Sequence, residues 1–141
     1  MTQKNPSHLV IYVDGASRGN PGPAAFGMVI RDDSGKAVKS AGQRIGSVTN
    51  NVAEYFGLIF ALQEALMLRA DEVEIRTDSE LVAKQFSGEY KIKDTILKAL
   101  SLIVKHLERG FKLVRVVHVP REENTDADGL ANKALDEISL F

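Results

Sequence analysis

Four acidic residues stand where side chains from distant parts of the chain can meet: Asp14, Glu54, Asp78 and Asp128. Asp14 and Asp78 each end a run that predicts a β-strand, and open α/β sheets bind ligands at the carboxyl ends of their strands. Hard cations such as Mg²⁺ prefer oxygen ligands. Two such ions would activate a water and stabilise the leaving oxygen in an in-line displacement at phosphorus. The four acids therefore indicate a metal site for phosphoryl transfer.

Simpler roles are open for each of these acids. Asp78 suits a turn, and Asp128 follows Thr125 at the spacing of a capping box. Glu54 lies near the start of a predicted helix, where an acid complements the helix dipole. Asp14 has the fewest alternatives, because a charge at the end of an apolar strand needs a partner or a cation.

The hydrophobic pattern predicts a mixed sheet flanked by helices. Short β-branched runs predict strands, and apolar residues at helical spacing predict amphipathic helices. The Gly- and Pro-rich segment Gly15–Pro23 predicts a loop. Asn50 or Asn51 is predicted to cap the first long helix, and Asn124 or Thr125 the last. The predicted strands are 9–13, 24–31, 38–45, 72–78 and 111–119, and the predicted helices are 52–69, 80–86, 94–110 and 125–138.

Length and composition limit the classes of protein that the chain can belong to. Its 141 residues predict a single domain over residues 1–141, with residues 1–7 as a loose end. Cysteine is absent, which excludes disulfides and thiolate catalysis and favours the cytoplasm. The 18 basic and 19 acidic residues give a net charge of −1, which excludes a globally polybasic protein. No apolar run approaches the roughly 20 residues that span a bilayer, so no membrane partner is expected.

Four segments carry a resemblance to a known family. They are Asp14–Pro23, Thr49–Glu54, Thr77–Ser79 and Glu123–Ala131, and each brings one of the four acids. In this order the segments resemble the signatures of type-1 ribonuclease H, and the resemblance extends from about Leu9 to Leu135. It implies an α/β ribonuclease H-like fold, a five-stranded mixed sheet flanked by helices, with the first three strands antiparallel.

The resemblance also implies an activity, which is hydrolysis of the RNA strand of RNA/DNA hybrids to 5′-phosphate and 3′-hydroxyl products. By resemblance Asp14 bridges two Mg²⁺ ions, for which Mn²⁺ can substitute. Asp128 completes the site of the water-activating ion, and Glu54 with Asp78 holds the ion on the leaving-group side. Glu54 and the backbone of Gly15, Ala16 and Ser17 would sense ribose 2′-hydroxyls. The further substrate-binding residues implied are Asn20, Thr49, Asn50 and Asn51, of which Thr49 and Asn51 would lie along the minor groove and Asn20 would order the first loop.

The chain departs from many relatives at three places, one of which is Ser47, where relatives often have an arginine that grips a DNA phosphate and for which Arg44 is the nearest substitute. It lacks their basic, Trp-containing protrusion and has only scattered lysines there, as in a short-loop branch of the family. The loop before Asp128 carries Arg121, which we expect to be the accessory catalytic residue, with His118 as the alternative.

Two other functions stay open besides a monomeric ribonuclease H. A nuclease of the same superfamily could have relaxed specificity, for double-stranded RNA or junction DNA. A non-catalytic hybrid-binding module is disfavoured, because a pure binder gains nothing from clustering four negative charges.

Overall fold

Strand β1 (His8–Ser17) lies at the centre of a five-stranded sheet in the computed structural model, which describes residues 7–137. The strand order is β3-β2-β1-β4-β5. Strands β1, β2 and β3 pair antiparallel, whereas β4 runs parallel to both β1 and β5. The predicted mixed sheet is thereby confirmed. The other strands are β2 (Gly22–Arg31), β3 (Ala37–Val48), β4 (Glu72–Thr77) and β5 (Leu113–His118).

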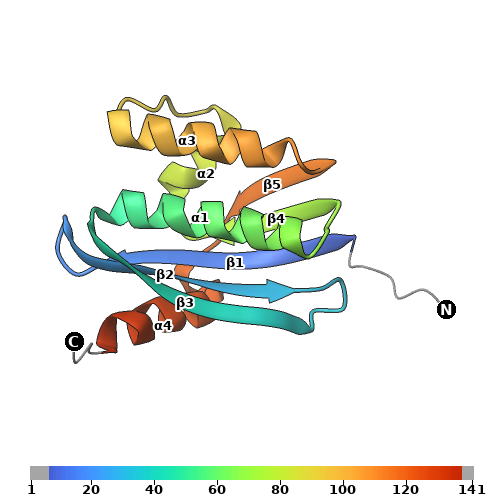
Figure 1. Ribbon diagram of the computed structural model, residues 1–141, viewed down its shortest axis with the longest axis horizontal. Coiled ribbons are helices and arrows are strands. Elements are labelled where there is room, and N and C mark those ends of the chain that lie inside the picture. The colour runs from blue at the N-terminus through green and yellow to red at the C-terminus, as the bar shows by residue number, and fades with distance from the viewer. Residues whose placement is uncertain (1–6, 138–141) are drawn as a thin grey trace.

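Helices cover the two faces of this sheet unequally. They are α1 (Asn50–Met67), α2 (Glu80–Ser87), α3 (Thr95–Glu108), the short 3-10 helix η1 (Arg121–Glu123) and α4 (Thr125–Asp136). Helix α1 packs on one face with α3 stacked outside it, and α4 alone lies on the other face (Figure 1). No helix within residues 7–137 is long and apolar enough to cross a membrane.

Alternation along β1 explains how the two layers form. Leu9, Ile11 and Val13 are buried against α1, as alternate residues of a strand point to one face. Val10 and Tyr12 point to the other face and are only half-buried, since α4 covers only part of it. The apolar run predicted a strand covered on both faces, but only the face that packs on α1 is fully covered.

Two glycines allow the helices to approach the sheet closely. A Cβ atom on Gly15 would lie 2.4 Å from the backbone nitrogen of Glu54 in α1. A Cβ atom on Gly27 would lie 2.1 Å from the backbone oxygen of Ala127 in α4. Both helices therefore touch the sheet backbone directly, one on each face, at the end of β1 where Asp14 lies.

Several predicted boundaries are wrong. Gly15–Ser17 continue β1 instead of forming a loop, because they pair with residues 24–26 of β2. Thr49, and not Asn50 or Asn51, caps α1, with its side chain accepting from the Val52 N–H at 3.3 Å. The remaining strands and helices lie within a few residues of their predicted bounds.

The N-terminal prediction is tested only in part. The Ser7 backbone oxygen accepts hydrogen bonds from Asp71 and Glu72, both at 2.8 Å, so Ser7 is not loose. Residues 1–6, and Ile138 of the predicted last helix, lie outside the described residues. That residues 1–141 form a single domain stays a prediction.

Candidate active site

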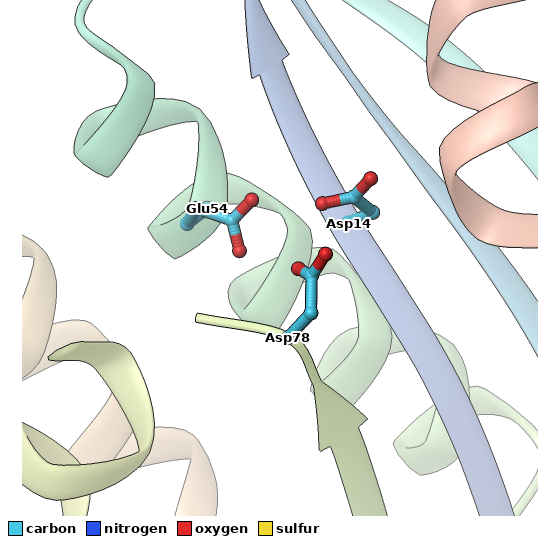
Figure 2. Close-up of side chains that lie close together, drawn as sticks. All are labelled: Asp14, Glu54 and Asp78. Carbon is cyan, nitrogen blue, oxygen red and sulfur yellow. The ribbon is translucent and has the colours of Figure 1, made fainter. Parts of the chain in front are cut away.

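Three carboxylates converge at the carboxyl ends of β1 and β4. Oxygens of Asp14, Glu54 and Asp78 all lie within 4.8 Å of one another. Figure 2 shows them pointing toward one another from β1, from α1 and from the residue that follows β4. Asp14 and Glu54 are 5% and 4% exposed. The parallel pairing of β1 with β4 brings the two aspartates together, as the sequence predicts.

Hydrogen bonds fix Glu54 in this group. Its Oε1 accepts from the Gly15 N–H at 2.6 Å, and its Oε2 accepts from the Thr77 hydroxyl at 3.3 Å. Glu54 thus connects α1 with both β1 and β4. Because Glu54 is buried and lies beyond the first turn of α1, the alternative that it merely complements the helix dipole is not supported.

The Asp78 side chain does not cap α2. Ser79 is the N-cap of α2, and its hydroxyl accepts from the Val82 N–H at 3.2 Å. The Ser79 N–H is itself bound by the Thr77 hydroxyl at 3.0 Å. The Asp78 carboxylate is directed toward Asp14 and Glu54 (Figure 2), with the Arg121 Nε 3.7 Å from its Oδ2.

Asp128 approaches the group from the opposite layer. It lies outside the tight set of three but lines the same cavity of about 330 Å³. The N-cap of α4 is Asn124, so the capping box with Thr125 is not formed. Instead the Asp128 Oδ1 accepts from the Asn132 side-chain amide at 3.2 Å.

Asn124 attaches α4 to the central strand. Its side-chain amide donates to the Val13 backbone oxygen at 2.8 Å, and the residue is 1% exposed. Asn124 therefore does not cap α4 with its side chain, although it occupies the N-cap position. Its bond to the residue before Asp14 sets the start of α4, and so the place of Asp128, relative to β1.

The electrostatics of the site disfavour the simultaneous ionisation of its carboxyl groups. Burial, followed by the negative charge of Glu54 and then the neighbouring Asp128 and Asp78 carboxyls, raises the pKa of Asp14. Burial also raises the pKa of Glu54, against the opposing effect of its bonds to Asp14 and the Gly15 N–H. Within residues 7–137, Arg121 is the one basic side chain recorded in an ion pair with these acids. Oxygen donors in this number and charge fit a hard divalent cation.

The remaining predicted substrate-binding residues differ in whether they line the cavity. Gly15, Ala16, Ser17 and Asn50 line it. Asn20 lies outside the lining, but its side-chain oxygen accepts from the Asn50 N–H at 3.0 Å, which orders the first loop. The other two, Thr49 and Asn51, lie at the start of α1 beside the cavity and are not among its lining residues.

Arg121 and His118 differ in their access to the site. Arg121 lies on η1, lines the cavity and has a side chain that is 87% exposed. His118 is the last residue of β5, is exposed and is not among the lining residues. The geometry thus favours Arg121 over His118 as the basic group at the site.

Asn132 was missed by sequence reasoning although it lines the cavity. Its signal is the four-residue spacing from Asp128, which puts both side chains on one face of a helix.

A mixed five-stranded sheet with acids from both layers at the ends of its central strands is the fold and site that the resemblance to ribonuclease H implies. The family model described as "Reverse transcriptase-like" matches residues 12–134. Ribonuclease H of Polynucleobacter asymbioticus is 44% identical, and the match covers 96% of each chain. The chain belongs to the ribonuclease H family, whose members are metal-dependent.

Two further relatives are type-1 enzymes. Ribonuclease HI of Halobacterium salinarum is 47% identical over 89% of this chain, and the crystal structure of ribonuclease H1 from that organism has a TM-score of 0.91. The structure of LC11-RNase H1 in complex with an RNA/DNA hybrid has 43% identity and a TM-score of 0.86, covering 91% of this chain and 96% of that one. The chain spans 63% of the Halobacterium relative and 35% of the matched mycobacterial proteins.

Proposed function

We propose that this protein is a ribonuclease H that hydrolyses the RNA strand of RNA/DNA hybrids, leaving 5′-phosphate and 3′-hydroxyl ends. The observation that carries the proposal is the convergence of Asp14, Glu54 and Asp78 within 4.8 Å, with Asp128 across the same cavity. The similarity to a ribonuclease H1 that was solved with a hybrid supports the substrate.

The four carboxylates are the residues that would hold two Mg²⁺ ions, or Mn²⁺ in their place. When bound, such ions lower the pKa of a water and neutralise charge on the leaving oxygen. The water oxygen forms a bond to phosphorus, and the bond from phosphorus to the ribose 3′-oxygen breaks. The resemblance to type-1 ribonuclease H implies that Asp14 would be the ligand shared by both ions, with Asp128 on the water side and Glu54 and Asp78 on the leaving-group side.

Recognition of RNA is assigned to the residues around Glu54. The Glu54 carboxylate is fixed by Gly15, and Gly15, Ala16 and Ser17 line the cavity, where a ribose 2′-hydroxyl would be met. The Ser17 hydroxyl donates to the Val48 backbone oxygen at 2.8 Å, which ties the end of this segment to the end of β3.

The start of α1 would follow the hybrid beyond the cavity. We assign minor-groove contacts to Thr49 and Asn51 and a contact at the cavity rim to Asn50, with Asn20 ordering the loop through its bond to Asn50. We also propose that the protein acts as a monomer in the cytoplasm, which sedimentation and cell fractionation can test.

Incubation with labelled RNA/DNA hybrid, double-stranded RNA and double-stranded DNA tests this function. We expect cleavage of the hybrid with Mg²⁺ or Mn²⁺, none with EDTA, and none by Asp14→Asn, which should still bind the hybrid because Asp14 is assigned to metal and not to phosphate. Intact hybrid under all conditions would refute the proposal. Equal cleavage of double-stranded RNA would instead favour a nuclease of relaxed specificity.

A further inference from the structure

Asn132 makes a specific contact with the fourth carboxylate of the site. Its side-chain nitrogen lies 3.2 Å from the Asp128 Oδ1 and 3.0 Å from the Asp128 backbone oxygen. The two residues are one helical turn apart on α4, and both line the cavity. One amide group therefore binds Asp128 at its main chain and at its carboxylate.

The other acids of the site are held by different donors. Glu54 is bound by the Gly15 N–H and the Thr77 hydroxyl, and Asp78 is paired with Arg121. Among the residues that the structure describes, Asn132 is the one whose nitrogen donates a hydrogen bond to the Asp128 carboxylate. Asp128 is only half-buried and otherwise meets the Asp14 carboxyl, so the bond from Asn132 is the contact within α4 that restricts its rotamer.

The turn of α4 that carries Asn132 is itself anchored. The Arg18 guanidinium donates to Asp136 at 2.6 Å and to the Asn132 backbone oxygen at 3.4 Å. Arg18 follows β1 directly, in the loop after the segment assigned to substrate binding. The position of Asn132 is thus tied to the first loop as well as to α4.

Asparagine is a suitable residue type for a hydrogen bond to a metal-binding carboxylate. A neutral amide donates to a carboxylate without the positive charge that would compete with a cation at the same site. Asparagine is also less favourable than alanine inside a helix, so its contribution to the helix alone does not explain its place in α4.

We propose that Asn132 is a positioning residue, which holds the Asp128 carboxylate in the orientation that a divalent cation requires. This inference rests on the proposed metal-dependent function. Loss of a partner that orients a metal ligand typically weakens metal binding or activity by about 10- to 100-fold.

Three variants of α4 test the inference by Mn²⁺ affinity, measured by calorimetry or electron paramagnetic resonance, and by the Mg²⁺ dependence of kcat. We expect Asn132→Ala to weaken cation binding by about 10-fold. Asn132→Asp replaces the donor with a negative acceptor, so its cation affinity should differ from that of Asn132→Ala. The melting temperature of Asn132→Ala should not fall, because alanine favours the helix. Lys133→Ala, an exposed neighbour outside the cavity lining, should leave the cation affinity unchanged.

A double-mutant cycle decides whether Asn132 acts through Asp128. If it does, Asn132→Ala should cause no further loss of Mn²⁺ affinity in an Asp128→Asn background. Wild-type affinity in Asn132→Ala, or an equal loss in both backgrounds, would overturn the inference while leaving hybrid cleavage by the wild type intact. Absence of cleavage by the wild type would instead refute the function on which the inference rests.

Discussion

Asp14 carries an electrostatic cost that is specific to the metal-free protein. Its carboxylate is 5% exposed, and its ionised form is opposed by burial, by the charge of Glu54, by a hydrogen bond with Asp128 and by the charge of Asp78. A carboxyl group whose pKa is raised by folding stabilises the fold only while it is protonated.

This cost predicts an unusual dependence of stability on pH. Because folding raises the pKa of Asp14 above its ordinary value of 3.8, its contribution is complete below that pH and is lost as the pH rises. In EDTA we therefore expect the wild type to lose stability from about pH 4 upward, and Asp14→Asn to be more stable at pH 8 by about 1–3 kcal/mol. Urea unfolding at a series of pH values measures this difference.

The control for this experiment is Glu89→Gln, which removes an exposed acid outside the cavity lining. It should leave the pH profile of the wild type unchanged. A wild type that becomes more stable between pH 5 and pH 8 in EDTA would contradict the placement of Asp14 among uncompensated carboxylates.

Arg121 makes a prediction about turnover. Its guanidinium is mostly exposed and lies 3.7 Å from the Asp78 carboxylate, so it can reach a phosphate in the cavity without being held rigidly. Removal of a donor that meets charge developing in the transition state lowers kcat more than it affects binding. We expect Arg121→Ala to lower kcat by roughly 10-fold with a smaller change in KM. Steady-state kinetics on the hybrid measure both constants.

His118→Ala is the comparison for Arg121, because His118 was the alternative accessory residue and lies outside the cavity lining. It should keep kcat within about twofold of the wild type. A normal kcat for Arg121→Ala together with a low one for His118→Ala would reverse the assignment.

The sequence could predict the acids of the site but not the groups that hold them. The acids stand at the ends of apolar runs or in helices, where a charge is conspicuous. Asn124 and Asn132 are not conspicuous, because a capping or surface asparagine looks the same in a sequence as one that binds Val13 or Asp128. Their contacts depend on how α4 sits on the sheet, which hydrophobic periodicity does not specify.

Among the elements, α4 decides whether Asp128 can join the other three acids. It crosses β2 at Gly27, where a Cβ atom would lie 2.1 Å from the Ala127 oxygen and 2.8 Å from the Ala131 nitrogen. Both of these are backbone atoms, so they cannot give way by changing a rotamer. Gly27 therefore sets the height of α4 above the sheet.

A pair of glycine substitutions tests this packing. We expect Gly27→Ala to destabilise the protein by about 3 kcal/mol and to lower cleavage, because α4 must move and carries Asp128 with it. Gly129→Ala, on α4 itself, has no heavy atom within 4 Å of the added Cβ and should stabilise the protein by about 1 kcal/mol. Chemical denaturation and hybrid cleavage measure the two effects, and equal stability of the two variants would argue against the close contact.

Periodicity predicted most of the elements, and its failures have local causes. The Gly and Pro content of Gly15–Pro23 suggested a loop, but pairing with β2 extends β1 to Ser17. Asn50 and Asn51 were favoured as caps by residue type, whereas the chain enters α1 at Thr49. In both cases a tertiary or turn geometry outweighed the local preference.

At the scale of the whole molecule, the net charge of −1 conceals the concentration of negative charge in the cavity. A phosphate backbone would be repelled from such a cavity until divalent cations reverse its sign. Entry of a phosphate into the cavity would therefore depend on the metal, whereas the contacts assigned to the start of α1 would not, so the proposed nucleic-acid substrate does not require an excess of basic residues.

The two faces of the sheet are held by cores of very different size. A large cluster of aliphatic and aromatic side chains joins the sheet to α1 and α3, whereas the cluster under α4 consists of Ala25, Ala134 and Leu135 with Ala16 against it. The layer with the smaller apolar contact is the one that opens first by local unfolding. Heat should then inactivate the enzyme reversibly before it melts, because release of α4 withdraws Asp128 and Asn132 while three carboxylates stay in place. We therefore expect the thermal limit of activity to be set by α4 and not by the stability of the main core, which a comparison of the inactivation temperature with the melting temperature measures.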